Sequence, residues 1–354
     1  MNTRQVFLPT LVRVKPGALD RLGLYAQRQH YTRVALLYSA DLEGPLLERL
    51  RDALHAVEVV QSIPVREASF ESATALFSGL PAGVDALVGF GGGKALDVAK
   101  YVAFLARLPY LAVPTSLSND GFCSPQSSLT LGGRRRSLPS RMPFGVIVDT
   151  EVCREAPLPL WWSGVGDLVS KFTAVRDWKL AFHAIGTPVD DLAALLSDAT
   201  VFQFMARPEH DASGMQLLAS ALMLNGIAME MCGSSRPASG SEHLLSHALD
   251  ASSPRPRLHG LQVGVATYLV SHLQGGDHEA IGGLLDRIDF WQAFSDDPLD
   301  RAEWLAAARL APRIKTGFYT VFDQRDWLPE IRRLLHEDAR LQRIFRGAGG
   351  SLAG

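Results

Sequence analysis

The sequence predicts the α/β fold class: an N-terminal Rossmann-like domain with a mostly parallel sheet, followed by an all-α C-terminal domain. Short apolar runs alternate with helix-periodic segments as far as about residue 150, as in parallel sheets covered by helices. Beyond Pro157 the segments become long and helix-periodic, with few β-branched runs. A length of 354 residues suits about two domains. We therefore expect an α/β domain at 1–155 and a helical domain at 156–354.

The first half of the sequence contains the expected strands and helices in alternating order. The apolar run at 33–42 predicts a strand, and the segment 44–57, with apolar residues three and four apart, predicts a helix. The stretch 85–115 repeats the order: an apolar strand, a glycine turn, a helix and a second strand that stops at Pro114. The run 143–150 adds another strand. In the second half, 160–184 and 214–233 predict long helices, the latter buried or at an interface.

Composition excludes several classes of function. A formal net charge of -2 gives no general attraction to nucleic acid or to an anionic membrane, and we expect neither as a partner. The three arginines at 134–136 read as a solvated hairpin tip or as a local anion contact. Three widely spaced cysteines predict neither a disulfide framework nor a Cys-based zinc site. No apolar run has signal-peptide or membrane-spanning length, so we expect a cytoplasmic protein. The apolar helices of the second half predict a homodimer or a higher homo-oligomer.

A glycine turn at 91–93 is a candidate phosphate cradle. It lies between a buried strand and a helix that begins near Lys94, where free N–H groups and the helix dipole favour a diphosphate. The turn matches neither GxGxxG nor a P-loop. On the plainer interpretation it is only a tight turn, with Asp97 a first-turn acid and Lys100 a surface lysine.

The polar loop at 113–130 follows the next strand end. It gathers Thr115, Ser116, Ser118, Asn119 and Asp120, and ligands of open α/β sheets bind beyond the carboxyl ends of the strands. Side-chain to backbone hydrogen bonds in a turn would also account for these residue types. Two such loops on successive strand ends favour a nucleotide site.

Histidines in the second half form a candidate metal-ligand set. His243 and His247 stand four positions apart, on one face if 241–250 is helical. His259 and Asp167 each begin another apolar helical stretch, and each has a glycine as its neighbour. One carboxylate and two or three imidazoles suit a borderline divalent metal such as zinc. The alternatives are hydrogen-bonded core or surface histidines and an N-terminal helix acid.

Five ordered segments carry a family resemblance: "GFGGGKALDVAK", "PTSLSNDGFCSP", "SGVGDLVSKFTAVRDWKLA", "GIAMEMCGSSRPASGSEHLLSHALD" and "LHGLQVGVAT". Together they resemble the sn-glycerol-1-phosphate dehydrogenase family, part of the superfamily of glycerol dehydrogenase, the iron-type alcohol dehydrogenases and dehydroquinate synthase. The resemblance extends from about residue 85 to 270, and "GSSRPASGSEH" with the following "SH" is its most specific part.

The resemblance implies a dehydroquinate synthase-like fold and a set of site residues. The residues that would bind NAD or NADP are Gly91, Gly92, Gly93, Lys94, Ala95, Leu96, Asp97, Thr115, Ser116, Leu117, Ser118 and Ser124. Asp167, His243 and His259 would hold one divalent metal, zinc in the first place, with nickel or iron as alternatives. His247, Asp120 and Asp167 would take part in catalysis, His247 and Asp120 by contacting the substrate. The implied reaction interconverts dihydroxyacetone phosphate, a phosphorylated three-carbon substrate, and sn-glycerol 1-phosphate.

Some choices stay open at this level. The candidates for binding the substrate phosphate are Arg236, Lys171 and the arginines at 134–136, without a ranking. Asp41 is a candidate partner for a ribose hydroxyl, which would favour NAD. Leu261 stands where the family often has an acidic residue. The alternative functions are a dehydrogenase of another polyol or of another phosphorylated or phosphonate carbonyl, and a dehydroquinate synthase-like cyclase. A binding protein without catalysis is disfavoured, because the whole metal set is present.

Overall fold

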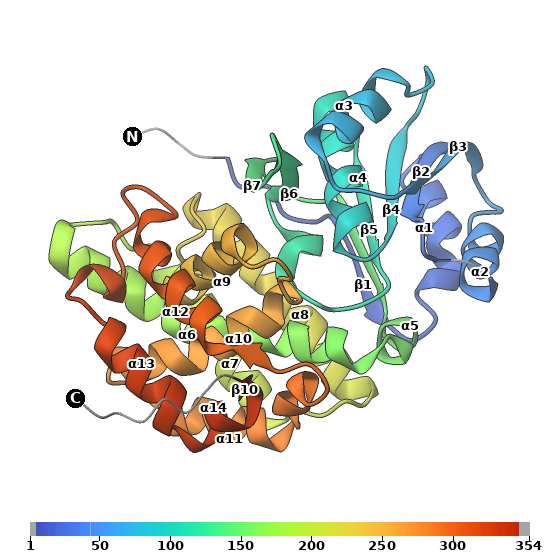
Figure 1. The fold of residues 1–354 in the computed structure, drawn as a ribbon. Helices are drawn as coiled ribbons and strands as arrows, with labels where there is room; N and C mark the ends of the chain where they lie inside the picture. The colour runs from blue at the N-terminus through green and yellow to red at the C-terminus, as the bar shows by residue number, and fades with distance from the viewer. Residues whose placement is uncertain (1–4, 43, 347–354) are drawn as a thin grey trace. The chain divides into compact units, whose positions relative to one another are not determined.

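The computed structural model describes residues 5–42 and 44–346, and their contacts form two compact units. The first unit is Met1–Trp161 with Glu209–Gly233, and the second is Trp162–Pro208 with Ser234–Gly354. The segment Glu209–Gly233 thus lies outside the expected range 1–155 and packs with the first unit. The strands gather in the first unit and most of the helices in the second (Figure 1).

A six-stranded parallel sheet organises the first unit, which confirms the predicted fold class. Its strand order is β1-β8-β5-β4-β2-β3. The strands are β1 (Leu11–Lys15), β2 (Arg33–Ser39), β3 (Glu58–Val65), β4 (Ala86–Gly91), β5 (Tyr110–Pro114) and β8 (Gly145–Asp149). The central strands β4 and β5 are buried along their whole length, because helices cover both faces of the sheet.

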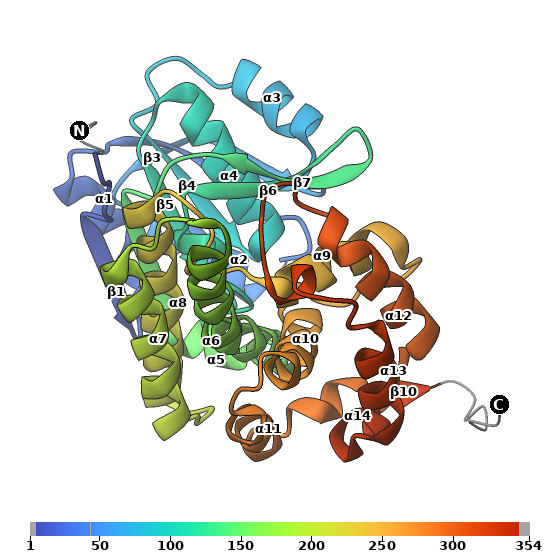
Figure 2. The same cartoon turned by 90° about the vertical axis from the view of Figure 1, so that its left-hand side faces the viewer.

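Five helices cover the sheet: α1 (Leu22–Arg28), α2 (Pro45–Ala53), α3 (Phe70–Ser78), α4 (Gly93–Ala106) and α5 (Thr150–Glu155). Residues of α1, α2 and α5 share one apolar core with the sheet, and residues of α3 and α4 share the other, as the layers in Figure 2 show. A small antiparallel hairpin, β6 (Gln126–Leu131) with β7 (Arg134–Pro139), follows the polar loop. Its tip is Gly132 and Gly133, so the three exposed arginines begin β7 instead of forming the tip.

Helix α8 (Ala212–Cys232) completes the first unit. It packs backbone to backbone against the 3-10 turn Asp120–Cys123, since a Cβ atom on Gly226 would overlap the carbonyl oxygen of Cys123. Within the described residues it is the one helix long and apolar enough to cross a membrane. Of its apolar 18-residue stretch, 56% is buried inside the structure. That burial is what a core helix of a soluble protein shows.

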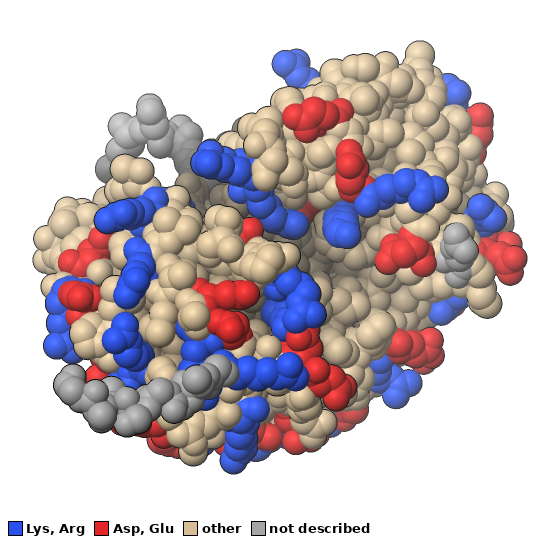
Figure 3. Space-filling model, viewed as in Figure 1, with Lys and Arg blue, Asp and Glu red and all other residues tan. Residues whose placement is uncertain are grey.

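The second unit is helical, as the sequence predicts. Its helices are α6 (Leu158–Ile185, which starts in the first unit), α7 (Asp191–Ala206), α9 (Ser241–Ser252), α10 (His259–Leu273), α11 (His278–Arg287), α12 (Arg301–Leu310), α13 (Leu328–Glu337) and α14 (Ala339–Ile344). Two short strands, β9 (Leu299–Asp300) and β10 (Phe345–Arg346), pair in parallel. On the face drawn in Figure 3, basic and acidic side chains are interspersed.

Glycines let α6 and α10 cross with their backbones in contact. A Cβ atom on Gly166 would overlap the carbonyl oxygen of Gly260, and one on Gly264 would press on Gly166 and on the ring of Phe290. The chain neighbours of two of these glycines are Asp167 and His259. The helix crossing therefore brings two of the predicted metal ligands to one place.

Candidate metal centre and cofactor loops

The glycine turn of the first unit lies at the carboxyl end of β4. Gly91 has a φ of 131°, which other residues rarely adopt, and a Cβ atom there would overlap the hydroxyl of Ser39 at the end of β2. That hydroxyl accepts a hydrogen bond from the Gly92 N–H at 3.0 Å. Gly92 then caps α4 without a side chain, so the start of α4 offers unpaired N–H groups beside an open backbone.

The two predicted cofactor loops lie side by side. β4 and β5 are paired neighbours, and the Thr115 N–H donates to the carbonyl oxygen of Gly91 at 3.1 Å. Ala95, Leu96 and Leu117 bury their side chains, so these three offer a ligand only their backbone. Lys94 is exposed at the start of α4. Ser116 follows β5 as a buried hydroxyl, while Gly93 and Ser118 are half-buried in their loops.

The side chain of Lys100 connects helix α4, which follows the glycine turn, to the polar loop. Its buried ammonium donates to the carbonyl oxygen of Gly121 at 2.6 Å and to the Ser124 hydroxyl at 3.3 Å, and lies 3.4 Å from Asp97. Burial raises the pKa of Asp97, although the nearby Lys100 opposes this rise. The same ammonium therefore fixes helix α4 to the turn that begins at Asp120. The interpretation of Lys100 as a surface lysine is wrong.

Asp167, His243 and His259 converge in the second unit. One ligand atom from each lies within 4.8 Å of the others. The Nε2 atoms of His243 and His259 are 3.5 Å and 3.9 Å from Oδ1 of Asp167. Asp167 comes from α6, His243 from the first turn of α9 and His259 from the first residue of α10. Three helices thus supply one carboxylate oxygen and two imidazole nitrogens.

The surroundings of both histidines leave Nε2 directed at Asp167. Nδ1 of His243 lies 2.9 Å from the Glu242 carboxylate, and Nδ1 of His259 lies 3.3 Å from the Ser246 hydroxyl. Partners on the second ring nitrogen are what orients metal-binding histidines in proteins. The donor set and its orientation therefore fit a divalent cation such as zinc.

Lys171 is the unexpected member of this group. It is fully buried one helical turn after Asp167, with its ammonium 3.3 Å from the Asp167 carboxylate. Burial opposes ionisation of Asp167, but Lys171 and the hydrogen bond from His243 lower its pKa below the usual range. Burial and the charge of His243 lower the pKa of His259 to about 3. Asp167 is thus held ionised and His259 neutral, the forms in which these groups bind metals.

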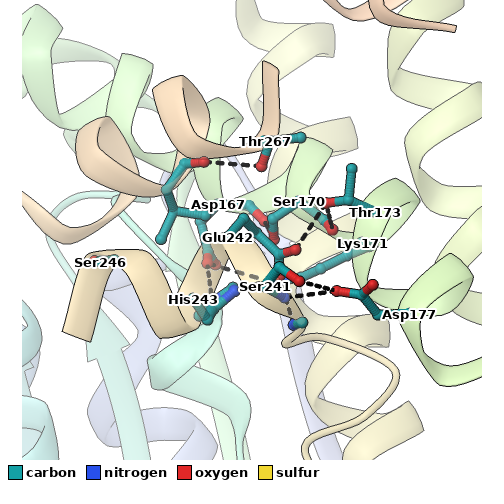
Figure 4. A network of polar contacts seen from close by, with 12 residues as sticks. Asp167, Ser170, Lys171, Thr173, Asp177, Ser241, Glu242, His243, Ser246 and Thr267 are labelled. Atoms are coloured by element: carbon teal, nitrogen blue, oxygen red, sulfur yellow. Dashed lines mark hydrogen bonds and ion pairs between the residues drawn. The ribbon is translucent and has the colours of Figure 1, made fainter. Parts of the chain in front are cut away.

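A buried polar network fixes the start of α9 (Figure 4). Asp177 accepts hydrogen bonds from the Ser241 N–H at 2.7 Å, the Ser241 hydroxyl at 2.6 Å and the Val321 N–H at 2.9 Å. Glu242 accepts from the Thr173 hydroxyl at 2.8 Å. Burial and the neighbouring Glu242 raise the pKa of Asp177 to about 6. Hydrogen bonds to Asp177 of α6 and to Glu242 of α9 therefore hold the first turn of α9, and with it His243, against α6.

His247 lies beside the metal group without belonging to it. Its ring centroid is 6.4 Å from that of His243 and 5.9 Å from that of His259, and its Nδ1 is 3.9 Å from Asp250. Its side chain is 40% exposed, so it remains open to a ligand. Asp120, the other predicted substrate contact, begins the 3-10 turn of the first unit and is half-buried.

The sequence predicts the metal ligands but not the residues that support them. The pairs Asp97 with Lys100 and Asp167 with Lys171 have helical spacings of three and four, and that signal was available. Asp177 gives no local signal, since its partner Val321 is 144 positions away.

The chain is similar to known proteins both in its sequence and in its fold. The family model described as "Iron-containing alcohol dehydrogenase" matches residues 13–157. Among solved structures, glycerol dehydrogenase from Schizosaccharomyces pombe has a TM-score of 0.75 at 16% identity, covering 97% of this chain and 92% of that one. Sulfoacetaldehyde reductase from Bifidobacterium kashiwanohense has a TM-score of 0.69 at 17% identity, covering 95% and 98%. At such identities these structures show the fold.

Curated relatives are more similar. "Glycerol-1-phosphate dehydrogenase [NAD(P)+]" of Methanothermobacter thermautotrophicus is 35% identical over 335 residues, which cover 92% of this chain and 95% of the relative. The protein with the same name from Aeropyrum pernix is 34% identical and covers 94% of this chain and 96% of its own. Identity at this level over nearly the whole length of both chains establishes common family membership. The chain belongs to the glycerol-1-phosphate dehydrogenase family.

Proposed function

We propose that this chain is a metal-dependent NAD(P)H dehydrogenase that interconverts dihydroxyacetone phosphate and sn-glycerol 1-phosphate. The convergence of Asp167, His243 and His259 within 4.8 Å carries the proposal, in a chain whose relatives over more than nine-tenths of its length have this name. The small phosphorylated substrate and the nicotinamide cofactor follow from those names.

Asp167, His243 and His259 are the residues that would hold the metal. Three protein ligands leave a coordination position open, as in catalytic zinc sites. A cation bound there would polarise a carbonyl group and would stabilise the negative charge that develops on its oxygen during reduction. Two imidazoles and one carboxylate suit zinc first, and nickel or iron also accept this set.

The other side chains bind, orient and move protons. The open backbone at Gly92 and Gly93 and the start of α4 would bind the cofactor diphosphate, together with Ser116 after the neighbouring strand β5. Asp120 would accept a hydrogen bond from a substrate hydroxyl and so orient the three-carbon chain. His247, exposed one turn from His243, would give a proton to the substrate oxygen on reduction and take it back on oxidation.

A spectrophotometric assay tests the reaction. Purified, zinc-reconstituted protein is mixed with NADH or NADPH and either dihydroxyacetone phosphate or dihydroxyacetone, before and after chelation, and the stereochemistry of the product is determined. We expect chelator-sensitive oxidation of the cofactor that favours the phosphate and yields the sn-1 isomer. Failure to turn over either ketone would refute the proposed substrate, and a cyclase would consume no NADH overall.

We also propose a cytoplasmic homodimer, supported by an apolar stripe on α7. The stripe consists of exposed side chains three and four positions apart: Leu192, Leu195, Ala199, Phe202 and Ala206. Such spacing is that of a helix seam that pairs with another helix. A second copy related by a two-fold axis would place Asp190 and Asp191 at the start of α7 beside Arg207 at its end. The described cysteines are free, which suits a reducing compartment.

A further inference from the structure

Helix α9 carries an imidazole and a carboxylate side by side next to the metal group. His243, His247 and Asp250 are four and three positions apart, so they share one face of the helix. Nδ1 of His247 lies 3.9 Å from Oδ2 of Asp250, and the two side chains are 40% and 20% exposed. Within residues 5–42 and 44–346, His247 is the one basic side chain within 4 Å of this carboxylate, so no second cation competes for it there.

The amide of Gln262 fixes the other oxygen of Asp250. Gln262 lies on α10 and is 2% exposed, and its side-chain nitrogen donates to Oδ1 of Asp250 at 3.0 Å. Its side-chain oxygen accepts a hydrogen bond from the Arg257 N–H at 2.9 Å. Because a backbone N–H only donates, the amide oxygen must face Arg257 and the amide nitrogen must face Asp250. Oδ1 is thus occupied by a donor from α10, and Oδ2 is left on the side of His247.

The same amide also supports the metal group. Its nitrogen donates to the Ser246 hydroxyl at 3.0 Å, and that hydroxyl lies 3.3 Å from Nδ1 of His259. The ring centroid of His247 is 5.9 Å from that of His259. One buried side chain, Gln262, therefore supports a metal ligand through Ser246 and the neighbouring imidazole through Asp250.

A carboxylate at this position decides which ring nitrogen of His247 carries its proton. A neutral imidazole has one N–H and an ionised carboxylate only accepts, so a bond to Asp250 keeps the proton on Nδ1. Nε2 then has a free lone pair. The separation of 3.9 Å is longer than a hydrogen bond, and a small turn of the partly exposed ring about its Cβ–Cγ bond would close it. An aspartate holds the histidine of the serine-protease triad in the same way.

We propose that Asp250, held by Gln262, is a positioning residue that keeps a proton on Nδ1 of His247 and presents Nε2 to the reacting hydroxyl of the substrate. The inference rests on the proposed function and adds the groups that orient its proton-transfer residue. On reduction a proton leaves Nε2 for the substrate oxygen, and the ring stays neutral with hydrogen on Nδ1. On oxidation the proton returns to Nε2, and the carboxylate offsets the charge of the imidazolium.

Asp250→Asn is the matched change, because it keeps the shape of the side chain. Gln262 can donate only to the oxygen of the new amide, so the NH2 group of that amide faces His247 and donates to Nδ1. The proton of the neutral ring is then forced onto Nε2, which can no longer accept a proton from the substrate.

The control is Asp338→Asn. Oδ2 of Asp338 lies at the same 3.9 Å from a histidine nitrogen, Nε2 of His272. His272 is in the last turn of α10, whereas His259 is the first residue of that helix, so the two are about 20 Å apart along it. The control thus changes a similar pair far from the metal group.

Steady-state kinetics separate positioning from a bond that merely ties α9 to α10. We expect kcat for dihydroxyacetone phosphate to fall on the order of 10- to 100-fold in Asp250→Asn, with KM and zinc content close to those of the parent. Asp250→Glu, which keeps the charge, should recover part of the loss, and Asp338→Asn should behave like the parent. In a His247→Gln background, Asp250→Asn should cost less than about twofold more, because the residue that it orients is already gone. An equal further loss in both backgrounds would overturn the proposal.

The position of the proton on His247 tests the inference without turnover. Nitrogen-15 NMR of zinc-loaded protein with labelled histidine, at a pH where the ring is neutral, reports which ring nitrogen carries hydrogen. We expect hydrogen on Nδ1 in the parent and in Asp338→Asn, and on Nε2 in Asp250→Asn. This result supports the positioning role even if dihydroxyacetone phosphate is not converted, in which case the proposed function fails alone. The same tautomer in all three proteins would overturn the inference.

Asp250→Ala gives a second measurement should Asp250→Asn not fold. It only removes a partly exposed side chain, and without the carboxylate the form with hydrogen on Nδ1 should lose its dominance. Retention of that form in Asp250→Ala would equally overturn the inference.

Discussion

Removing the ammonium of Lys171 should destabilise the metal-free protein strongly and the metal-loaded protein weakly. Lys171→Met keeps the length of the side chain but leaves the Asp167 carboxylate, 1% exposed, without the cation that lies 3.3 Å away. Breaking a buried ion pair by removing one partner costs about 3–5 kcal/mol. For a helical unit of this size that corresponds to a fall in melting temperature on the order of 10 °C. A divalent cation bound to Asp167 supplies the missing positive charge, so the loss should shrink to below about 2 kcal/mol.

Thermal unfolding with and without zinc measures both values. The matched control is Lys179→Met, two turns further along α6, whose ammonium is 3.5 Å from Asp198 and whose side chain is 54% exposed. An exposed pair of this kind contributes about 0–1 kcal/mol, so the control should melt near the parent protein in both forms. Equal destabilisation of Lys171→Met with and without zinc would show that the lysine does not compensate the charge of a metal-binding carboxylate.

Three further predictions concern other parts of the chain. Gly91→Ala should cost at least about 1–3 kcal/mol of stability and weaken NADH binding, since φ is 131°, while Gly92→Ala should melt like the parent; equal melting of the two variants in calorimetry would contradict this. Leu195→Glu should convert the dimer to monomer in light scattering, and an unchanged mass would remove α7 from the interface. Burial and His278 lower the pKa of His272 to about 4, so the unfolded state binds a proton below about pH 6.5 that the folded state does not. Stability should therefore fall between pH 6.5 and 4, less steeply in His272→Gln, and parallel curves would count against this origin.

The central strands and the long helices can be predicted from the sequence. Burial of the strands on both faces leaves an uninterrupted apolar run, which is easily recognised. β4 and β5 read as continuous apolar runs, and α9 begins where the glycine- and serine-rich segment 233–240 ends. The strands β1 and β3 were missed because they lie at the two edges of the sheet and keep exposed or half-buried positions, as in Glu58 and Val59. α8 is apolar on all sides, so its periodicity does not say which unit it joins.

In the candidate site, too, one part could be predicted from the sequence and another part could not. The residues expected to hold the metal could be named from a carboxylate, two imidazoles and a family resemblance, and the structure brings Asp167, His243 and His259 together. The groups that support them depend on contacts between distant parts of the chain. Asp177 contacts Val321 at a separation of 144 positions, and Glu242 contacts Thr173 at 69. Pairings of that kind leave no local pattern, since each partner reads as an ordinary polar residue.

The glycine crossing of α6 and α10 makes the spacing of the ligands a property of the backbone. At Gly166 and Gly260 no side chain separates the two helices. Rearrangement of neighbouring side chains can therefore change the distance between the helices very little there. A single methyl group at either position would act as a wedge, moving Asp167 away from His259 although both side chains were intact. The resulting defect would be a loss of metal affinity from a residue that touches no metal. Two positions without side chains thus set the distance across which the cation must be held.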